Sequence, residues 1–132
     1  MRIRGVARNE RGFTLVEIIA VLIILGILAA VAVPRYMSLT TDAKNSSAAA
    51  AVAEGKARVN QMAASYILKN GGTIPAAADL NTGDYVFGTT AGDFILTYAA
   101  SGTTGIAITG SGRAGGPAAG GTAVGTAALP TN

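Results

Sequence analysis

A single carboxylate interrupts an apolar run near the start of the chain. The run, FTLVEIIAVLIILGILAAVAV, covers residues 13–33, and Glu17 is its only charged residue. An ionisable group inside a membrane-spanning helix costs about 2.5–3.5 kcal/mol on insertion scales, so a function is expected for it. The chain has no His and no Cys, which removes the usual zinc and copper ligands and most nucleophilic dyads. We therefore expect no catalytic residue, no metal site and no cofactor, and we expect that the protein is not an enzyme.

Two further patterns resemble ligand sites and are interpreted otherwise. Residues 110–115 satisfy G-x-G-x-x-G, but Gly-Pro follows instead of a helix, so a flexible glycine loop is predicted. Asp79, Asp84 and Asp93 could serve as calcium ligands, yet no acidic residue follows Asp93. A cage built from the later loops would lack carboxylates, so we expect these aspartates to form turns.

The net charge of +3 is concentrated at one end of the chain. Residues 1–12 carry the whole excess, because four arginines there outweigh Glu10, whereas residues 13–132 are neutral in sum. Such a basic leader before an apolar segment is a topology signal rather than a phosphate-binding surface. By the positive-inside rule, residues 1–12 lie in the cytoplasm and the chain beyond Arg35 lies outside it. No nucleic-acid partner is predicted.

The apolar run is long enough to cross a membrane. As an α-helix its 21 residues would rise roughly 30 Å, the thickness of a bilayer's hydrocarbon core. A secretory signal peptide would have a shorter apolar core and small residues at its cleavage site. Residues 13–36 are therefore predicted to form a transmembrane helix, with Pro34 near its exit.

Residues 37–132 are predicted to form a head outside the membrane. Apolar residues recur at three-to-four spacing from Val52 to Tyr66, which indicates one buried stripe on a helix over 42–69. Asn70-Gly71-Gly72 is a helix stop, and a loop follows to residue 84. The period then becomes two, which predicts an antiparallel sheet over about 85–124 and a Gly/Ala-rich tail. The expected strands are 85–87, 94–98 and 106–109, with a weak fourth near 122–124. The fold class predicted is α+β, a long N-terminal helix on a three- or four-stranded sheet whose Phe94, Leu96, Ile106 and Ile108 face the helix stripe.

The segment Arg11-Gly12-Phe13-Thr14-Leu15-Val16-Glu17 leads directly into the apolar run. It resembles the prepilin processing site shared by type IV pilins and type II secretion pseudopilins. The resemblance covers about residues 11–36, including Pro34, and the rest of the chain is similar to that family only in its expected architecture.

The resemblance implies roles for five residues. A prepilin peptidase would cut between Gly12 and Phe13, remove the leader and methylate the new amine of Phe13. In a filament, Glu17 would pair with the Phe13 amine of a neighbouring subunit; the alternative is a Glu17 satisfied within its own chain. Helicity would be lost between Gly26 and Pro34 on assembly.

The resemblance also implies a function, partners and a location. The chain would be a pilin, most like a type IV pilus major subunit, that forms a homopolymer. Its partners would be the prepilin peptidase, the inner-membrane assembly machinery and the membrane itself. It would begin as a single-pass inner-membrane protein with a cytoplasmic N-terminus and end in an extracellular pilus. A minor pilin and a major pseudopilin of type II secretion are the alternatives, although the missing late carboxylates argue against the pseudopilin. Adhesion, twitching motility, DNA uptake and electron conduction are all compatible roles of such a filament.

Overall fold

The computed structural model describes residues 12–131. Residues 1–11 of the predicted leader lie outside this range. The chain divides into two compact units after Met37, and the second unit is Ser38–Asn132. The first helix, α1, is Leu15–Lys69, and residues 15–37 of it belong to the first unit.

In the first unit, α1 is apolar and exposed on every side. Its large hydrophobic side chains from Leu15 to Val33 are all solvent-accessible, and its most apolar window has a mean hydropathy of 3.0. By length and composition, α1 is the one helix among residues 12–131 that could cross a membrane. It continues through Gly26 and Pro34 without interruption in this single chain.

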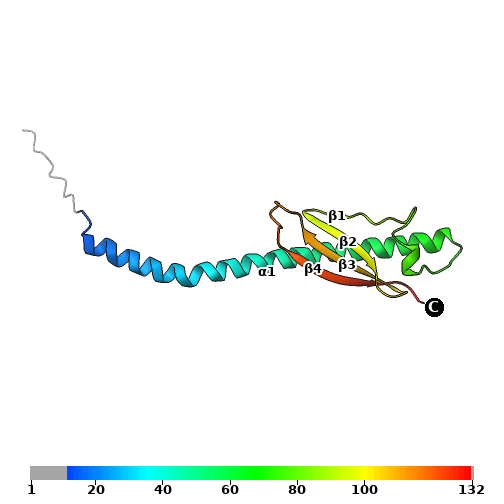
Figure 1. Ribbon diagram of the computed structural model, residues 1–132, viewed down its shortest axis with the longest axis horizontal. Coiled ribbons are helices and arrows are strands. Elements are labelled where there is room, and N and C mark those ends of the chain that lie inside the picture. The colour runs from blue at the N-terminus through cyan, green and yellow to red at the C-terminus, as the bar shows by residue number, and fades with distance from the viewer. Residues whose placement is uncertain (1–11, 132) are drawn as a thin grey trace, which may run out of the picture. The chain divides into compact units, whose positions relative to one another are not determined.

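In the second unit, α1 packs against a four-stranded antiparallel sheet (Figure 1). The strands follow one another in chain order across the sheet. They are β1 (Thr90–Ala91), β2 (Phe94–Ala100), β3 (Gly105–Gly112) and β4 (Thr122–Ala128), preceded by the short helix η1 (Ala77–Asp79). This arrangement confirms the predicted α+β fold with a long helix on a small antiparallel sheet.

Turns at the predicted glycines separate these elements. Asn70-Gly71-Gly72 ends α1 after Lys69: both glycines have positive φ, and the Gly72 N–H donates to the Ile67 carbonyl at 2.8 Å. Such a left-handed stop suits glycine because a Cβ would be strained there. Gly92, with φ 56°, opens the two-residue turn between β1 and β2.

The expected strand at residues 85–87 is wrong. The first strand begins at Thr90 instead, and residues 85–89 belong to no helix or strand. Phe87 is buried there, with its ring 4.6 Å from that of Tyr98, centroid to centroid. The alternating apolar residues of this segment therefore reflect the burial of Phe87 from a loop and not the presence of a strand. The fourth strand is also longer than predicted and runs to Ala128.

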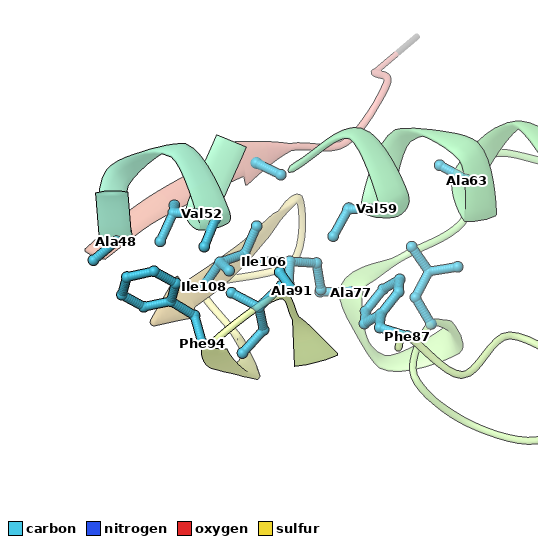
Figure 2. Packing of buried hydrophobic residues seen from close by; sticks show 14 of the residues in the cluster. Ala48, Val52, Val59, Ala63, Ala77, Phe87, Ala91, Phe94, Ile106 and Ile108 are labelled. Atoms are coloured by element: carbon cyan, nitrogen blue, oxygen red, sulfur yellow. The ribbon is translucent and has the colours of Figure 1, made fainter. Parts of the chain in front are cut away.

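The core lies between one face of the sheet and one stripe of α1, as predicted (Figure 2). Leu96, Ile106 and Ile108 are fully or almost fully buried, and Phe94 is 7% exposed. The helix contributes mainly small residues: Ala48, Ala51, Val52, Gly55, Val59 and Ala63. A Cβ on Gly55 would lie only 3.0 Å from Ile108 Cγ2, so glycine lets helix and sheet approach closely.

Candidate functional site

The predicted scissile bond lies in an open, non-helical segment just before α1. Gly12, Phe13 and Thr14 precede the helix, which begins at Leu15, and Phe13 is 81% exposed. A Cβ built on Gly12 would meet no atom within 4 Å. Nothing in the fold of the described residues therefore requires glycine at position 12.

Thr14 and Glu17 are joined by three reciprocal hydrogen bonds at the start of α1. Glu17 Oε2 accepts from the Thr14 backbone N–H at 2.8 Å and from Thr14 Oγ1 at 2.9 Å. In return, the Glu17 N–H donates to Thr14 Oγ1 at 3.2 Å. This is a capping box, in which the residue before the helix and the third residue of its first turn satisfy each other's orphan donors. The carboxylate also lies at the positive end of the helix dipole.

The capping box is the feature that our sequence reasoning missed. Its signal, Thr-x-x-Glu before an apolar run, is present in residues 14–17. The intrachain partner of Glu17 is thus Thr14. Both bonds to the carboxylate end on Oε2, and Oε1 has no hydrogen-bond partner among residues 12–131.

Phe13 and Glu17 are brought to one place on the surface. They line the same open hollow, together with Ile18, Ala20 and Val21. In the uncut chain, the Phe13 nitrogen is a peptide N–H; cleavage after Gly12 would convert it into an ammonium beside this carboxylate. The described residues therefore contain the acidic partner of the expected charge pair, and processing would create the basic one.

Gly26 and Pro34 lie apart from this group. Gly26 follows Glu17 by nine residues, which corresponds to about 14 Å along a helix. A Cβ on Gly26 would meet nothing within 4 Å. The loss of helicity expected between these residues concerns the assembled filament and stays a prediction.

Residues 12–131 contain no group of three or more His, Cys, Asp or Glu side chains that could hold a metal ion. Asp79 instead accepts a hydrogen bond from the Ala76 N–H at 2.8 Å and caps η1. The flexible glycine loop predicted for residues 110–115 is wrong at its start, because Gly110 and Gly112 belong to β3 and Gly110 packs on Val52. No helix follows them, so the phosphate-binding context is missing.

Comparisons with known proteins match short parts of the chain. Residues 7–33 match the family described as the prokaryotic N-terminal methylation motif. The type II secretion system core protein G of Pseudomonas aeruginosa is 57% identical over 37 residues, which are 28% of this chain and 26% of that protein. The type IV narrow pilus major component PilA5 of Thermus thermophilus is 46% identical over 45 residues, 34% of this chain and 39% of that protein.

The matched segments thus span about a quarter and two-fifths of these two relatives. No solved structure matches the chain. The family match at residues 7–33 includes the processing motif and the apolar run.

Proposed function

We propose that this chain, whose amino-terminal segment is that of the pilin and pseudopilin family, is a structural subunit of an extracellular type IV pilus. The observation that carries the proposal is the sequence from Gly12 to Glu17 at the exposed start of an apolar helix. A prepilin peptidase would cut between Gly12 and Phe13 and methylate Phe13. The product would polymerise with copies of itself.

The exposed apolar surface of residues 13–33 favours a protein that is always embedded in lipid or packed against other protein chains. The side chains of residues 13–33 have no intrachain core to cover them. Contiguous apolar surface of this extent needs a membrane or other protein around it. Lipid would cover it before assembly, and the helices of other subunits would cover it afterwards. The four leader arginines favour a cytoplasmic N-terminus in the inner membrane.

Glu17 would supply axial register. After cleavage, the Phe13 ammonium of one subunit would meet the Glu17 carboxylate of a neighbour inside the apolar filament core. A subunit out of step would leave a buried charge without a partner, which is strongly unfavourable. Before assembly, Thr14 would hold the carboxylate in its place at the helix start, and the free Oε1 would be available to the incoming amine.

A major pseudopilin of type II secretion is the second candidate. The similarity to core protein G of Pseudomonas aeruginosa, 57% identical over 37 residues, favours it. Deleting the gene separates the two functions: loss of surface filaments with normal protein secretion supports the pilus subunit, and the reverse supports the pseudopilin.

Processing is tested by the intact mass of the chain in sheared surface filaments. We expect a chain that begins at Phe13 with one added methyl group. Replacing Gly12 by a bulky residue such as leucine should leave uncut precursor in the membrane. Gly12→Ala is the matched variant that adds only a methyl group. Because a Cβ at position 12 meets no other atom, an effect of either change reports peptidase recognition rather than misfolding. Filaments built from chains that retain the leader would refute the proposal.

A further inference from the structure

The head has a hollow at the end where α1 first meets the sheet, which we call the head hollow. It has a volume of about 310 Å³, and its lining includes Ala43, Lys44, Asp93, Phe94, Pro117 and Ala118. These residues belong to α1, to the start of β2 with the turn before it, and to the loop between β3 and β4. Lys44 Nζ donates to the Ala119 carbonyl at 2.9 Å, and the Arg113 N–H donates to the Asp93 carbonyl at 2.9 Å. The three segments that form the hollow are therefore held to one another.

Asp93 supplies the carboxylate of the head hollow. Its side chain makes no hydrogen bond or ion pair within residues 12–131, although its backbone carbonyl is bonded to Arg113. The basic group in the lining, the Lys44 ammonium, is already bonded to Ala119. A cation in the hollow would therefore meet a carboxylate without a competing partner, beside the buried ring of Phe94. An apolar side chain next to a basic one, whose stem is also apolar, fits this combination.

The opposite end of the head presents such a pair of side chains. Leu68, in the last turn of α1, is 84% exposed, more than any other exposed large hydrophobic residue of the second unit. Lys69 follows it and ends the helix. The Lys69 ammonium lies 5.5 Å from the centroid of the Tyr85 ring and forms no ion pair with residues 12–131. In Figure 1, the end of α1 and the loop between β3 and β4 lie at opposite ends of the sheet.

A single chain cannot bring the two ends together. From Ala43 to Leu68, α1 continues without interruption, which corresponds to about 38 Å along its axis. The end of α1 can therefore reach only the head hollow of another copy that is displaced along the helix by about this distance. Such a contact is head-to-tail and uses two different surfaces, so all copies point in the same direction. A repeated head-to-tail contact produces a filament rather than a closed dimer.

We propose that Leu68 and Lys69 of one copy dock in the head hollow of a second copy, with the Lys69 ammonium paired to Asp93 of that copy. The α1 helices of the two copies stay parallel. This neighbour is not the one whose Phe13 would meet Glu17, because that pair displaces two copies by only about one helical turn, roughly 6 Å. The inference rests on the proposed function, since a filament is what displaces copies along α1.

The absence of cysteine from the natural chain makes the contact testable by cross-linking. Full-length chains with both Ala43→Cys and Leu68→Cys are expected to give a ladder of disulfide-linked dimers, trimers and larger multimers when sheared filaments are mildly oxidised. The two sites of one chain are too far apart to link, because a disulfide needs Cα atoms within about 7 Å. Each single variant should give no ladder. Ala43→Cys with Val124→Cys is the matched control, since Val124 is 74% exposed but lies in the middle of β4.

Charge exchange tests the ion pair separately. In the double-cysteine background, Lys69→Glu and Asp93→Lys should each weaken ladder formation by about two- to five-fold, as expected for an exposed pair. Combining the two exchanges should restore the ladder, which would not happen if either change acted by disturbing the fold. Failure of the combined exchange to restore it overturns the pairing of Lys69 with Asp93.

Filament yield gives a test without cysteine. Leu68→Asp should cause a loss of filaments, because a carboxylate would enter the hollow beside Asp93, whereas Val124→Asp should leave the yield unchanged. A natural yield from Leu68→Asp overturns the proposal.

The remaining outcomes separate this inference from the proposed function. Filaments in which Ala43→Cys with Leu68→Cys links no better than the Val124 control overturn the inference alone. Dimers from either single cysteine variant overturn the head-to-tail arrangement, and an adduct with a different protein overturns the second copy as the occupant. A natural chain that forms no filament overturns the proposed function and this inference with it.

Discussion

At the scale of single residues, Glu17 has one partner in its own chain and a proposed one in its neighbour. Thr14 satisfies the carboxylate in the described chain, whereas the ammonium of Phe13 exists only after cleavage. Loss of the capping box and loss of the charge pair are therefore expected to affect filament yield differently. Two substitutions at this site separate them.

Glu17→Gln should permit normal cleavage and normal subunit level in the membrane, with few or no filaments. The amide removes the charge, and the Phe13 ammonium would then enter an apolar filament core without a counter-charge, a penalty of roughly 3–5 kcal/mol. Filament yield is measured in sheared fractions against the membrane pool of subunit. Uncleaved precursor would instead assign Glu17 to peptidase recognition.

Thr14→Val is the matched control for this prediction. It removes the hydroxyl of the capping box, at a cost of about 1 kcal/mol to the helix start, and it leaves the Glu17 charge in place. We expect filaments from Thr14→Val. Equal loss of filaments in both variants would mean that the cap, and not the charge pair, is the feature that assembly requires.

The processing residues could be predicted from the sequence because they follow one another along the chain. Gly12, Phe13 and Glu17 fall within a continuous motif, so no tertiary information is needed to recognise them. The hydrogen bonds of Glu17 were missed although Thr14 lies only three residues away. The cost of burying a charge indicates that Glu17 needs a partner, and only the Thr-x-x-Glu spacing identifies that partner as Thr14.

At the scale of elements, α1 combines a residue that weakens helices with one that breaks them. Pro34 cannot donate the helical hydrogen bond and its ring crowds the preceding turn, while Gly26 lowers helix propensity. The helix nevertheless continues through both in the single chain. If subunits assemble as proposed, the segment between them is expected to lose its helicity first.

Gly26→Ala is expected to keep this segment helical and to give stiffer, less extensible filaments. Alanine favours the helix by about 1 kcal/mol over glycine, and its Cβ meets no atom of this chain within 4 Å. Force-extension measurements on single filaments test the expectation. Ala29→Gly, which changes propensity in the opposite direction within the same segment, should soften them. Unchanged extensibility in both variants would contradict a role for local helix melting.

The elements of the head were predictable where local periodicity and burial agree. Phe94, Leu96 and the glycine stop after Lys69 are such cases. Residues 85–87 are the counterexample, since Phe87 is buried without belonging to the sheet. Arg58 explains the difference. Its guanidinium donates hydrogen bonds to the Gly88 and Thr90 carbonyls and holds this segment against α1. A contact across 30 residues leaves no periodic trace in the sequence.

At the scale of the whole molecule, the stability of the head depends on its hydrophobic core. The chain has no cysteine and therefore no disulfide, and small residues supply most of the helix side of the core. A small domain of this kind has a narrow margin of stability. Partly buried polar groups packed against the core therefore matter for its stability, and the Tyr98 hydroxyl is one of them.

Stability of the head should fall as the pH rises above about 10. Burial raises the pKa of the Tyr98 hydroxyl, against a smaller lowering effect of Arg58. The folded state therefore holds this proton more tightly than the unfolded state, whose tyrosine pKa is about 10. The stabilisation is complete below that pH and is lost as the pH rises through the folded-state pKa. Urea unfolding of a soluble fragment lacking residues 1–36 measures it.

Tyr98→Phe should remove this contribution to the pH dependence, at the cost of the bond from the hydroxyl to the Gly88 carbonyl. The substitution would then lower stability near pH 7 and flatten the decline above pH 10. An identical alkaline decline in Tyr98→Phe would assign the effect to other groups.

Leu96→Ala tests whether the head is held by packing between the sheet and the small-residue stripe of α1. Leu96 is 0% exposed, and it contacts the helix at Gly55, so truncation would leave a cavity that neither element can close easily. We expect the free energy of unfolding of the soluble fragment to fall by ~2–5 kcal/mol. The preceding residue provides the matched control, because Ile95 is 40% exposed on the opposite face of the same strand. Ile95→Ala removes a side chain of the same size, and its cost should be clearly smaller. Equal losses would place the core on both faces of the sheet, and a loss below about 0.5 kcal/mol for Leu96→Ala would show that this face carries no core.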